Sequence, residues 1–284
     1  MTDRIDCSLA ALNLHPIKSC AAVPVDEALV IETGLQLDRA WMVVDAKGVM
    51  LTQRAQPRMA LVQVKLREDD MVLRAPGMLA LHVSLDAVEE ATTARVWRDE
   101  VKAYDMGALA AQWFSDILGT PARLVRFDPE HKRLADPAWT GELAAEVAFA
   151  DGFPLLVAST ASLAELNRRL LEGGHAAIGP ERFRVNLWLD GLQAHDEDRI
   201  DEIGFDAEGG PVRIRLVKPC VRCVIPNVDP RSAEVGSEPW QTLSTYRADA
   251  RVQGGITFAM NAVILDGVDR VLRPGQRGSA TRKS

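Results

Sequence analysis

The feature that most constrains the fold is a series of short apolar or alternating segments in the first hundred residues. Segments 9–14, 28–31, 41–44, 49–52, 61–66 and 79–85 have the length and residue types typical of strands. Turn signals separate them, for example Asp45-Ala46-Lys47-Gly48 and Pro76-Gly77. Closely spaced strands joined by tight turns predict an antiparallel sheet or a barrel.

Helices are expected to be few. Residues 108–118 place Leu109, Trp113, Phe114 and Ile117 on one face, and a second helix is expected at 161–171 after a cap at Ser159 or Thr160. Further strands are predicted at 122–127, 155–158, 183–189, 212–217 and 262–265. The predicted fold class is therefore mainly β with several helices (α+β).

The domain organisation follows from a change in pattern near the middle of the chain. Residues 128–146 are polar and lack a clear period, so they are expected to link a first domain (1–127) to a second (147–276). The basic tail 277–284 is expected to fray. Trp97, Trp113 and Trp188 are expected in the core, whereas Trp139 in the linker is a candidate to line an opening.

Composition excludes several classes of function. The 284 residues are 47% hydrophobic and 26% charged, and the net charge is -7 without a basic stripe, so nucleic-acid binding is not expected. No apolar stretch approaches the ~18 residues of a membrane span. The polar N-terminus and the four cysteines indicate a cytoplasmic protein with reduced thiols.

The strongest chemical signal is the pair Cys220 and Cys223. A structural zinc site needs four ligands, and neither Cys7 and Cys20 nor the scattered histidines supply a second pair. A thioredoxin-like pair prefers the start of a helix, whereas this pair follows an alternating segment. Two buried thiols that only pack remain an alternative.

The surroundings of this pair favour a reactive thiolate over a packing role. Lys218, Arg222, Asp229 and Arg231 make the segment unusually polar for a core, and the cations would stabilise a thiolate. A soft thiolate with one protein attachment suits a metal that is carried in by an organic cofactor.

Several separated motifs resemble one known family. They are Lys218-Pro-Cys-Val-Arg-Cys-Val-Ile-Pro-Asn-Val-Asp229, Arg182-Phe-Arg-Val-Asn186 with Val185 where Pro is usual, His15-Pro-Ile-Lys-Ser-Cys20, Asp38-Arg-Ala-Trp41 and Leu51-Thr-Gln-Arg-Ala-Gln-Pro-Arg-Met59. Together they resemble MOSC-domain proteins, above all the amidoxime-reducing component and its bacterial relatives without a ferredoxin domain. The resemblance covers nearly the whole chain.

The resemblance implies the molybdenum cofactor, a molybdopterin that carries the metal, and does not lead us to expect pyridoxal phosphate. Cys223 would ligate molybdenum, and Asp151 would lie near the metal as a candidate catalytic group. The other candidates would bind or support the cofactor: Lys18, Ser19, Arg39, Arg184, Asn186, Cys220 and Arg222. Arginine offers phosphate a planar fork, and asparagine suits a pterin edge.

The fold and the activity implied by the resemblance are specific. An N-terminal β-barrel-like domain would precede a C-terminal MOSC β-barrel, with the cofactor between them. The protein would reduce N-hydroxylated compounds such as hydroxylamines and amidoximes. Because the chain lacks the cysteine set of a ferredoxin domain, the electrons would come from a separate ferredoxin, cytochrome b5-like or flavin protein.

Two alternatives remain open. The protein could carry the cofactor, or a persulfide on Cys220 or Cys223, for delivery. It could also bind the cofactor without activity.

Overall fold

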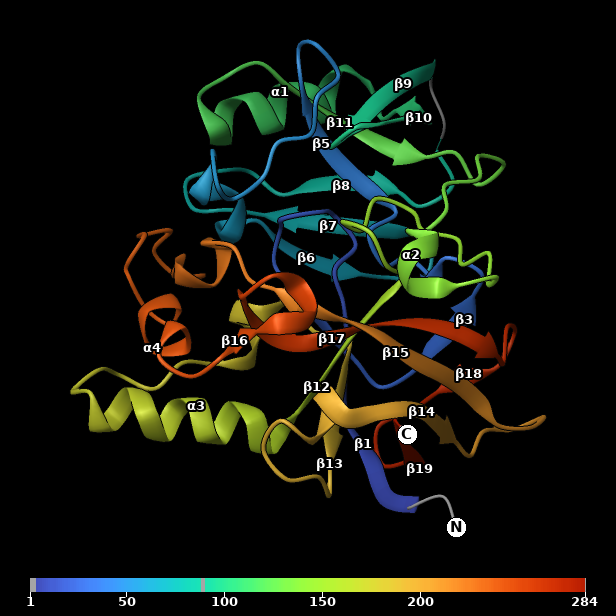
Figure 1. The fold of residues 1–284 in the computed structure, drawn as a ribbon. Coiled ribbons are helices and arrows are strands. Elements are labelled where there is room, and N and C mark those ends of the chain that lie inside the picture. The colour runs from blue at the N-terminus through green and yellow to red at the C-terminus, as the bar shows by residue number, and fades with distance from the viewer. Residues whose placement is uncertain (1–3, 88–89, 284) are drawn as a thin grey trace.

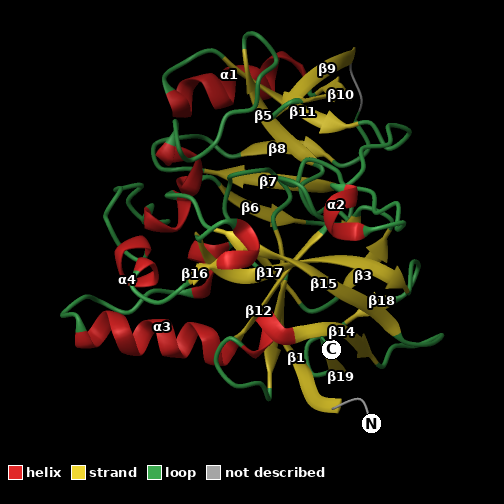
Figure 2. Cartoon of the chain, viewed as in Figure 1, coloured by secondary structure: helices red, strands yellow, loops and turns green. Residues whose placement is uncertain are grey.

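The computed structural model describes residues 4–87 and 90–283. In this part of the chain strands predominate and the helices are short, as Figure 2 shows. The prediction of a mainly β fold with several helices is confirmed.

The lower half of the molecule is a closed barrel (Figure 1). Its strands run in the order β12 (Leu155–Ser159), β13 (Leu187–Asp190), β1 (Arg4–Leu14), β19 (Arg277–Arg282), β14 (Ile200–Phe205), β15 (Val212–Val221) and β17 (Gly255–Asp266), and β17 pairs back onto β12. The pairing of β12 with β13 is parallel, and the other pairings in this barrel are antiparallel. Two short strands extend the sheet, β2 (Val23–Val25) on β1 and β16 (Ala248–Asp249) on β17.

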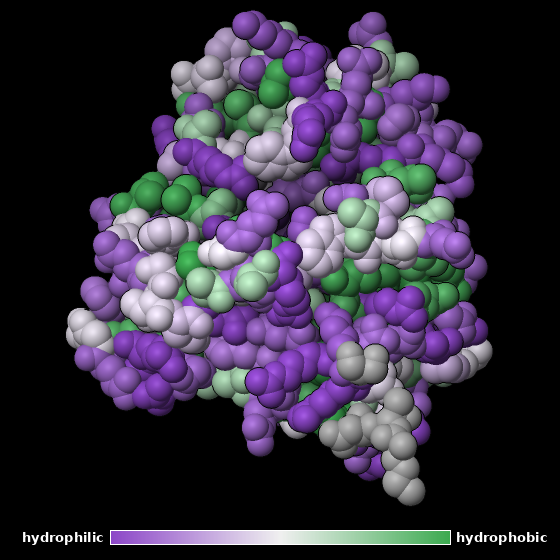
Figure 3. All heavy atoms as spheres, viewed as in Figure 1, coloured by the Kyte–Doolittle hydropathy of each residue, from purple (hydrophilic) through white to green (hydrophobic). Residues whose placement is uncertain are grey.

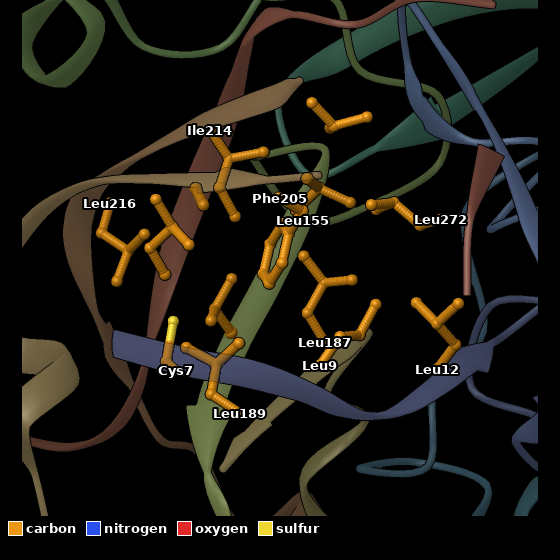
Figure 4. Close-up of a cluster of buried hydrophobic side chains, with 14 of the residues drawn as sticks. Cys7, Leu9, Leu12, Leu155, Leu187, Leu189, Phe205, Ile214, Leu216 and Leu272 are labelled. Carbon is orange, nitrogen blue, oxygen red and sulfur yellow. The ribbon is translucent and has the colours of Figure 1, made fainter. Parts of the chain in front are cut away.

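Apolar side chains fill the barrel (Figure 4). Alternation along β15 explains this, because Val212, Ile214 and Leu216 all point inward and are fully buried. Phe205 and Leu189 meet them from β14 and β13. Full burial of each such side chain contributes roughly 1.5–3 kcal/mol to stability.

The upper half is built from small antiparallel sheets. One sheet has the order β5 (Trp41–Asp45), β11 (Ala122–Phe127), β10 (Asp99–Asp105) and β9 (Glu90–Val96), and another joins β6 (Gln63–Leu66), β7 (Asp70–Arg74) and β8 (Leu81–Ser84). A further sheet, of β18 (Val271–Leu272), β3 (Ala28–Ile31) and β4 (Gly34–Leu35), lies beside the barrel and adds Val30, Leu35 and Leu272 to its core (Figure 1). Helix α1 (Gly107–Leu118) covers the upper half and buries Trp113, Phe114 and Ile117 in its core.

The remaining helices lie mostly around the barrel. Helix α3 (Thr160–Glu172) begins at the predicted cap, since Ser159 Oγ accepts a hydrogen bond from the Ser162 amide at 3.1 Å. Helices α2 (Pro137–Thr140) and α4 (Trp240–Ser244) are single turns. Short 3-10 turns complete the set: η1 (Pro57–Leu61), η2 (Pro180–Phe183), η3 (Asp196–Arg199), η4 (Ile225–Asn227) and η5 (Ala250–Val252).

Some local predictions were wrong. Residues 49–52 form isolated bridges rather than a strand, and 183–189 starts with the end of η2 before β13 begins. The predicted linker contains α2 and a bridge between Leu134 and Glu146. Leu109 and Trp97 are exposed, because α1 needs only one buried face and Trp97 lies in a turn.

The basic tail was expected to fray, and this too was wrong. Its residues form β19, which pairs with β1 on one side and with β14 on the other. Ala280 in its centre is fully buried. The first and last strands are thus neighbours in the barrel, and both ends of the chain lie at the bottom of Figure 1.

In the described ranges, no helix combines the length and the apolar character needed to cross a bilayer. Figure 3 shows a viewed face that is largely hydrophilic, with separate hydrophobic patches.

Candidate cofactor site

The structure brings all of the predicted site residues into one open pocket with a volume of about 130 Å³. The pocket lies where the upper half meets the barrel, and segments far apart in the sequence build it. Its predicted lining residues are Lys18, Ser19, Arg39, Asp151, Arg184, Asn186, Cys220, Arg222 and Cys223.

Three of these residues adopt the left-handed backbone conformation. The φ angles are 67° at Ser19, 48° at Arg39 and 55° at Arg184. Each such residue other than glycine costs roughly 1–2 kcal/mol, and strain of this kind concentrates at functional sites. The surrounding structure must therefore stabilise this backbone, and all three positions lie in the pocket lining.

Arg39 and Asn186 form the framework between the two halves. Arg39 Nη1 donates to Asn186 Oδ1 at 2.8 Å and to Asp38, and its Nη2 donates to the Arg184 carbonyl at 2.9 Å. Asn186 is fully buried and also donates to the Asn13 carbonyl at 3.1 Å. Because most polar groups of these two side chains are hydrogen-bonded within the protein, both residues support the pocket wall.

One guanidinium nitrogen of Arg184 makes no hydrogen bond within the described residues. Its Nη1 donates to the Cys20 carbonyl, whereas its Nη2 is buried and has no hydrogen-bond partner among the described residues. Burial and the neighbouring Arg39 lower the pKa of Arg184 to about 10, so it remains charged at neutral pH. A buried, unpaired guanidinium nitrogen is costly, and an anionic ligand would satisfy it.

Arg222 presents a second unpaired group. Its Nη1 donates to Cys220 Sγ at 3.1 Å and its Nη2 to the Phe183 carbonyl at 3.2 Å. Its Nε is buried and lacks a partner in the described part of the chain. The pocket thus holds two guanidinium groups with unused donors.

The two thiols have different surroundings. Cys220, at the end of β15, packs against the cluster that contains Phe183 and Phe258, and it accepts the bond from Arg222. Cys223 lies beyond the strand, is partly exposed and lines the pocket as a free cysteine. Both thiols thus line the pocket, and Cys220 is the one that accepts a hydrogen bond from Arg222.

Lys18 and Asp151 form an ion pair across the pocket. Lys18 Nζ donates to Asp151 Oδ1 at 2.5 Å and to the Phe149 carbonyl at 2.7 Å. Burial lowers the pKa of Lys18, and the Asp151 carboxylate opposes this. Desolvation within the pocket acts to raise the pKa of Asp151, but Lys18 and Trp97 outweigh it and hold that pKa below its usual range. Asp151 is therefore ionised at neutral pH and suited to accept hydrogen bonds rather than donate a proton.

Sequence reasoning missed Trp97 as a site residue. Its indole Nε1 donates to Asp151 Oδ1 at 3.1 Å, and the Arg54 guanidinium lies 4.7 Å from its ring centre. Arg54 also lines the pocket and belongs to the quoted segment 51–59, which was the available signal. The linker residue Trp139 lies against Lys218, whose ammonium also faces Phe153 in the pocket wall.

The described residues contain no cluster of three or more His, Cys, Asp or Glu side chains that could hold a metal ion. A metal bound by the Cys223 thiolate would need its other ligands from a non-protein group that already chelates it. The pocket lining combines free thiols with guanidinium groups, and these donor types fit a soft metal that an anionic organic cofactor carries.

The family comparison agrees with this geometry. The MOSC N-terminal beta barrel domain matches residues 7–121, and the MOSC domain matches residues 144–277. The chain belongs to the MOSC family. Mitochondrial amidoxime reducing component 2 of Bos taurus is 35% identical to this MOSC protein over 250 residues, which cover 84% of this chain and 72% of the relative.

Two human proteins show a similar degree of relationship to this MOSC protein. Mitochondrial amidoxime-reducing component 1 of Homo sapiens is 34% identical over 84% of this chain and 72% of its own length. Molybdenum cofactor sulfurase of Homo sapiens is 33% identical over 88% of this chain but only 30% of its own length. A function related to the molybdenum cofactor is thus supported.

Proposed function

We propose that this MOSC protein binds the molybdenum cofactor and reduces N-hydroxylated compounds such as hydroxylamines and amidoximes. Its relatives are named amidoxime reducing components, and the shared length includes both domains. A separate redox protein of the ferredoxin, cytochrome b5-like or flavin type would supply the electrons. The two halves, 1–127 and 147–276, would clamp the cofactor between them.

One observation carries the proposal. The free thiol of Cys223 shares its pocket with guanidinium nitrogens of Arg184 and Arg222 that have no partner among residues 4–87 and 90–283. A thiolate suits a soft metal, and guanidinium groups suit phosphate and other anionic oxygens. A molybdopterin combines both kinds of group in one ligand.

The residues of the chain have distinct roles in this proposal. Cys223 would hold the metal, and Arg184 and Arg222 would bind anionic oxygens with the help of Ser19. Asp38 and Asn186 hold Arg39, whose contact with the Arg184 carbonyl fixes the pocket wall. The bound cofactor supplies the two-electron chemistry, while the protein binds, orients and tunes it.

The test compares molybdenum content and activity in matched variants. We expect stoichiometric molybdenum in the wild type, a loss of at least ~10-fold in Cys223→Ser, and retention in Cys220→Ser. Reduced methyl viologen as electron donor and benzamidoxime as substrate provide the activity assay. Equal molybdenum in wild type and Cys223→Ser would refute the ligand assignment.

A second function is favoured by the match to molybdenum cofactor sulfurase. The chain would then carry cofactor, or a persulfide on Cys220 or Cys223, for delivery. Mass spectrometry would detect one added sulfur atom, and the viologen assay would show no reduction of any N-hydroxylated compound.

We also propose a cytoplasmic location. The amidoxime-reducing relatives are named as mitochondrial, so cell fractionation with an antibody to the chain is the direct test.

A further inference from the structure

Trp97 lies at the tip of the hairpin of β9 and β10 in an unusual conformation. Val96 pairs with Asp99, so the turn contains only Trp97 and Arg98. Trp97 has a φ of 56°, where such turns favour Gly, Asn or Asp. A bulky residue in this conformation costs roughly 1–2 kcal/mol. A residue that breaks a local rule in this way indicates a compensating or functional contact.

The contacts of Trp97 point to the pocket. Its indole donates to Asp151 Oδ1 at 3.1 Å, and the exposed Arg54 side chain stacks over it at 4.7 Å. Asp151 and Arg54 both line the pocket, so the hairpin brings the ring to its rim. The residue remains 46% exposed, which leaves ring surface for a ligand.

One carboxylate oxygen of Asp151 accepts no hydrogen bond within the described ranges. Lys18 and Trp97 both donate to its Oδ1, and no hydrogen bond to its Oδ2 is found within the described ranges. The carboxylate side chain is 63% exposed. The rim therefore combines a carboxylate held by two donors, one unused oxygen and an exposed aromatic ring.

We propose that Asp151, Trp97 and Arg54 form a specificity subsite that distinguishes among N-hydroxylated compounds. The subsite prefers planar compounds with an N–H donor beside the N–O bond, such as amidoximes and N-hydroxyguanidines, over oximes that lack this donor. The planar group packs on the Trp97 ring, and the amino group donates to Asp151. This inference rests on the proposed function.

The chemistry of the reduction gives the carboxylate a second role. An amidoxime, RC(NH2)=NOH, takes up two electrons from the cofactor and two protons, its N–O bond breaks, and an amidine and water result. The amidine then binds a third proton from solvent and becomes a cation shared by both nitrogens. An ionised carboxylate beside the amino group stabilises this product cation. The imine formed by reduction of an oxime has no amino group at that position.

The experiment measures binding and turnover on the molybdenum-loaded protein. Benzamidoxime and benzaldoxime differ at the carbon that carries the amino group, and calorimetry gives the Kd of each. We expect the wild type to bind benzamidoxime at least ~10-fold more tightly. Asp151→Asn should weaken benzamidoxime binding roughly 10–100-fold and leave benzaldoxime binding nearly unchanged.

Trp97→Phe keeps an aromatic ring and removes the N–H donor. We expect it to raise the KM for benzamidoxime by several-fold, roughly the loss of one hydrogen bond, with little change in kcat. Trp240→Phe is the matched control, because Trp240 is also exposed (39%) but lies on α4 outside the pocket lining. Molybdenum content is measured for each variant.

The outcomes separate the two proposals. Equal binding of both compounds by the wild type, equal losses for both in Asp151→Asn, or no binding of either compound would overturn the subsite. Selective binding that depends on Asp151 without any reduction would support the subsite and contradict the reductase function. Reduction of both compounds with equal kcat/KM would support the reductase and contradict the subsite.

Discussion

Arg39 Nη1 lies 2.8 Å from Asn186 Oδ1, and this hydrogen bond joins residues 147 positions apart. The same amide oxygen accepts from the Leu156 backbone at 3.1 Å, and the amide nitrogen donates to the Asn13 carbonyl. One buried amide therefore ties β1, β12 and the segment before β5 together beneath the pocket.

Asn186→Ala should destabilise the fold. It leaves a buried backbone amide and an arginine donor unpaired, so we expect the free energy of unfolding to fall by roughly 2–3 kcal/mol. Urea denaturation measures this. Asn167→Ala is the control, because Asn167 makes two bonds to Ile178 at a partly buried site, and about 1 kcal/mol is expected there. Equal losses would contradict the central position of Asn186.

Arg184→Gln should impair cofactor retention. The change removes the charged donor with an unpaired buried nitrogen, so we expect molybdenum content after gel filtration to fall by ~10-fold. Arg182→Gln is the control, since Arg182 pairs with Asp229 and lies outside this pocket lining. Similar molybdenum content in the two variants would show that the unpaired nitrogen is not a cofactor contact.

Gly278→Ala tests the packing of β19 against the barrel interior. A Cβ at this position would lie 2.8 Å from the Phe205 ring and 3.1 Å from the Cys7 sulfur, and neither can move freely. We expect a loss of about 1–3 kcal/mol in thermal unfolding. Gly204→Ala in β14 meets only Arg213 at 3.9 Å and should change stability by less than about 0.5 kcal/mol. An unchanged Tm for Gly278→Ala would contradict a tightly packed β19.

His15 should make the fold sensitive to mild acid. Burial, with Arg39 and Arg184, lowers the pKa of His15 from 6.5 to about 3. Below pH 6.5 the unfolded chain binds a proton that the folded chain does not, so stability present above that pH is lost as pH falls toward 3. Between pH 7 and pH 5, the wild type should lose roughly 2 kcal/mol more than His15→Gln. Parallel pH profiles would show that His15 takes up a proton as readily in the folded protein as in the unfolded chain, which would contradict the lowered pKa.

The sequence predicted the strands best where alternation was strong and burial followed it. The pattern of Val212, Ile214 and Leu216 correctly predicted a strand at 212–217, and in the structure this strand, β15, continues to Val221. It could not show that residues 277–282 pair on both sides, because Arg277, Gly278 and Ser279 carry no apolar signal and the strand is held by backbone bonds to β1 and β14.

The residues of the candidate site were predicted from motifs that resemble a known family, because hydrophobic periodicity does not identify them. The residues came together in one pocket, but no local pattern distinguishes Arg184, which keeps a free nitrogen, from Arg39, which the framework uses. Trp97 was missed because its partner Asp151 lies 54 positions away, on another part of the fold. Contacts of this kind depend on tertiary structure.

The pairing of β1 with β19 has a consequence for biosynthesis. Strand β1 is synthesised more than two hundred residues before β19, so the barrel can close only after Arg277–Arg282 has left the exit tunnel. Until then β1 lacks one of its two barrel neighbours, and its open edge is exposed to pairing with other chains.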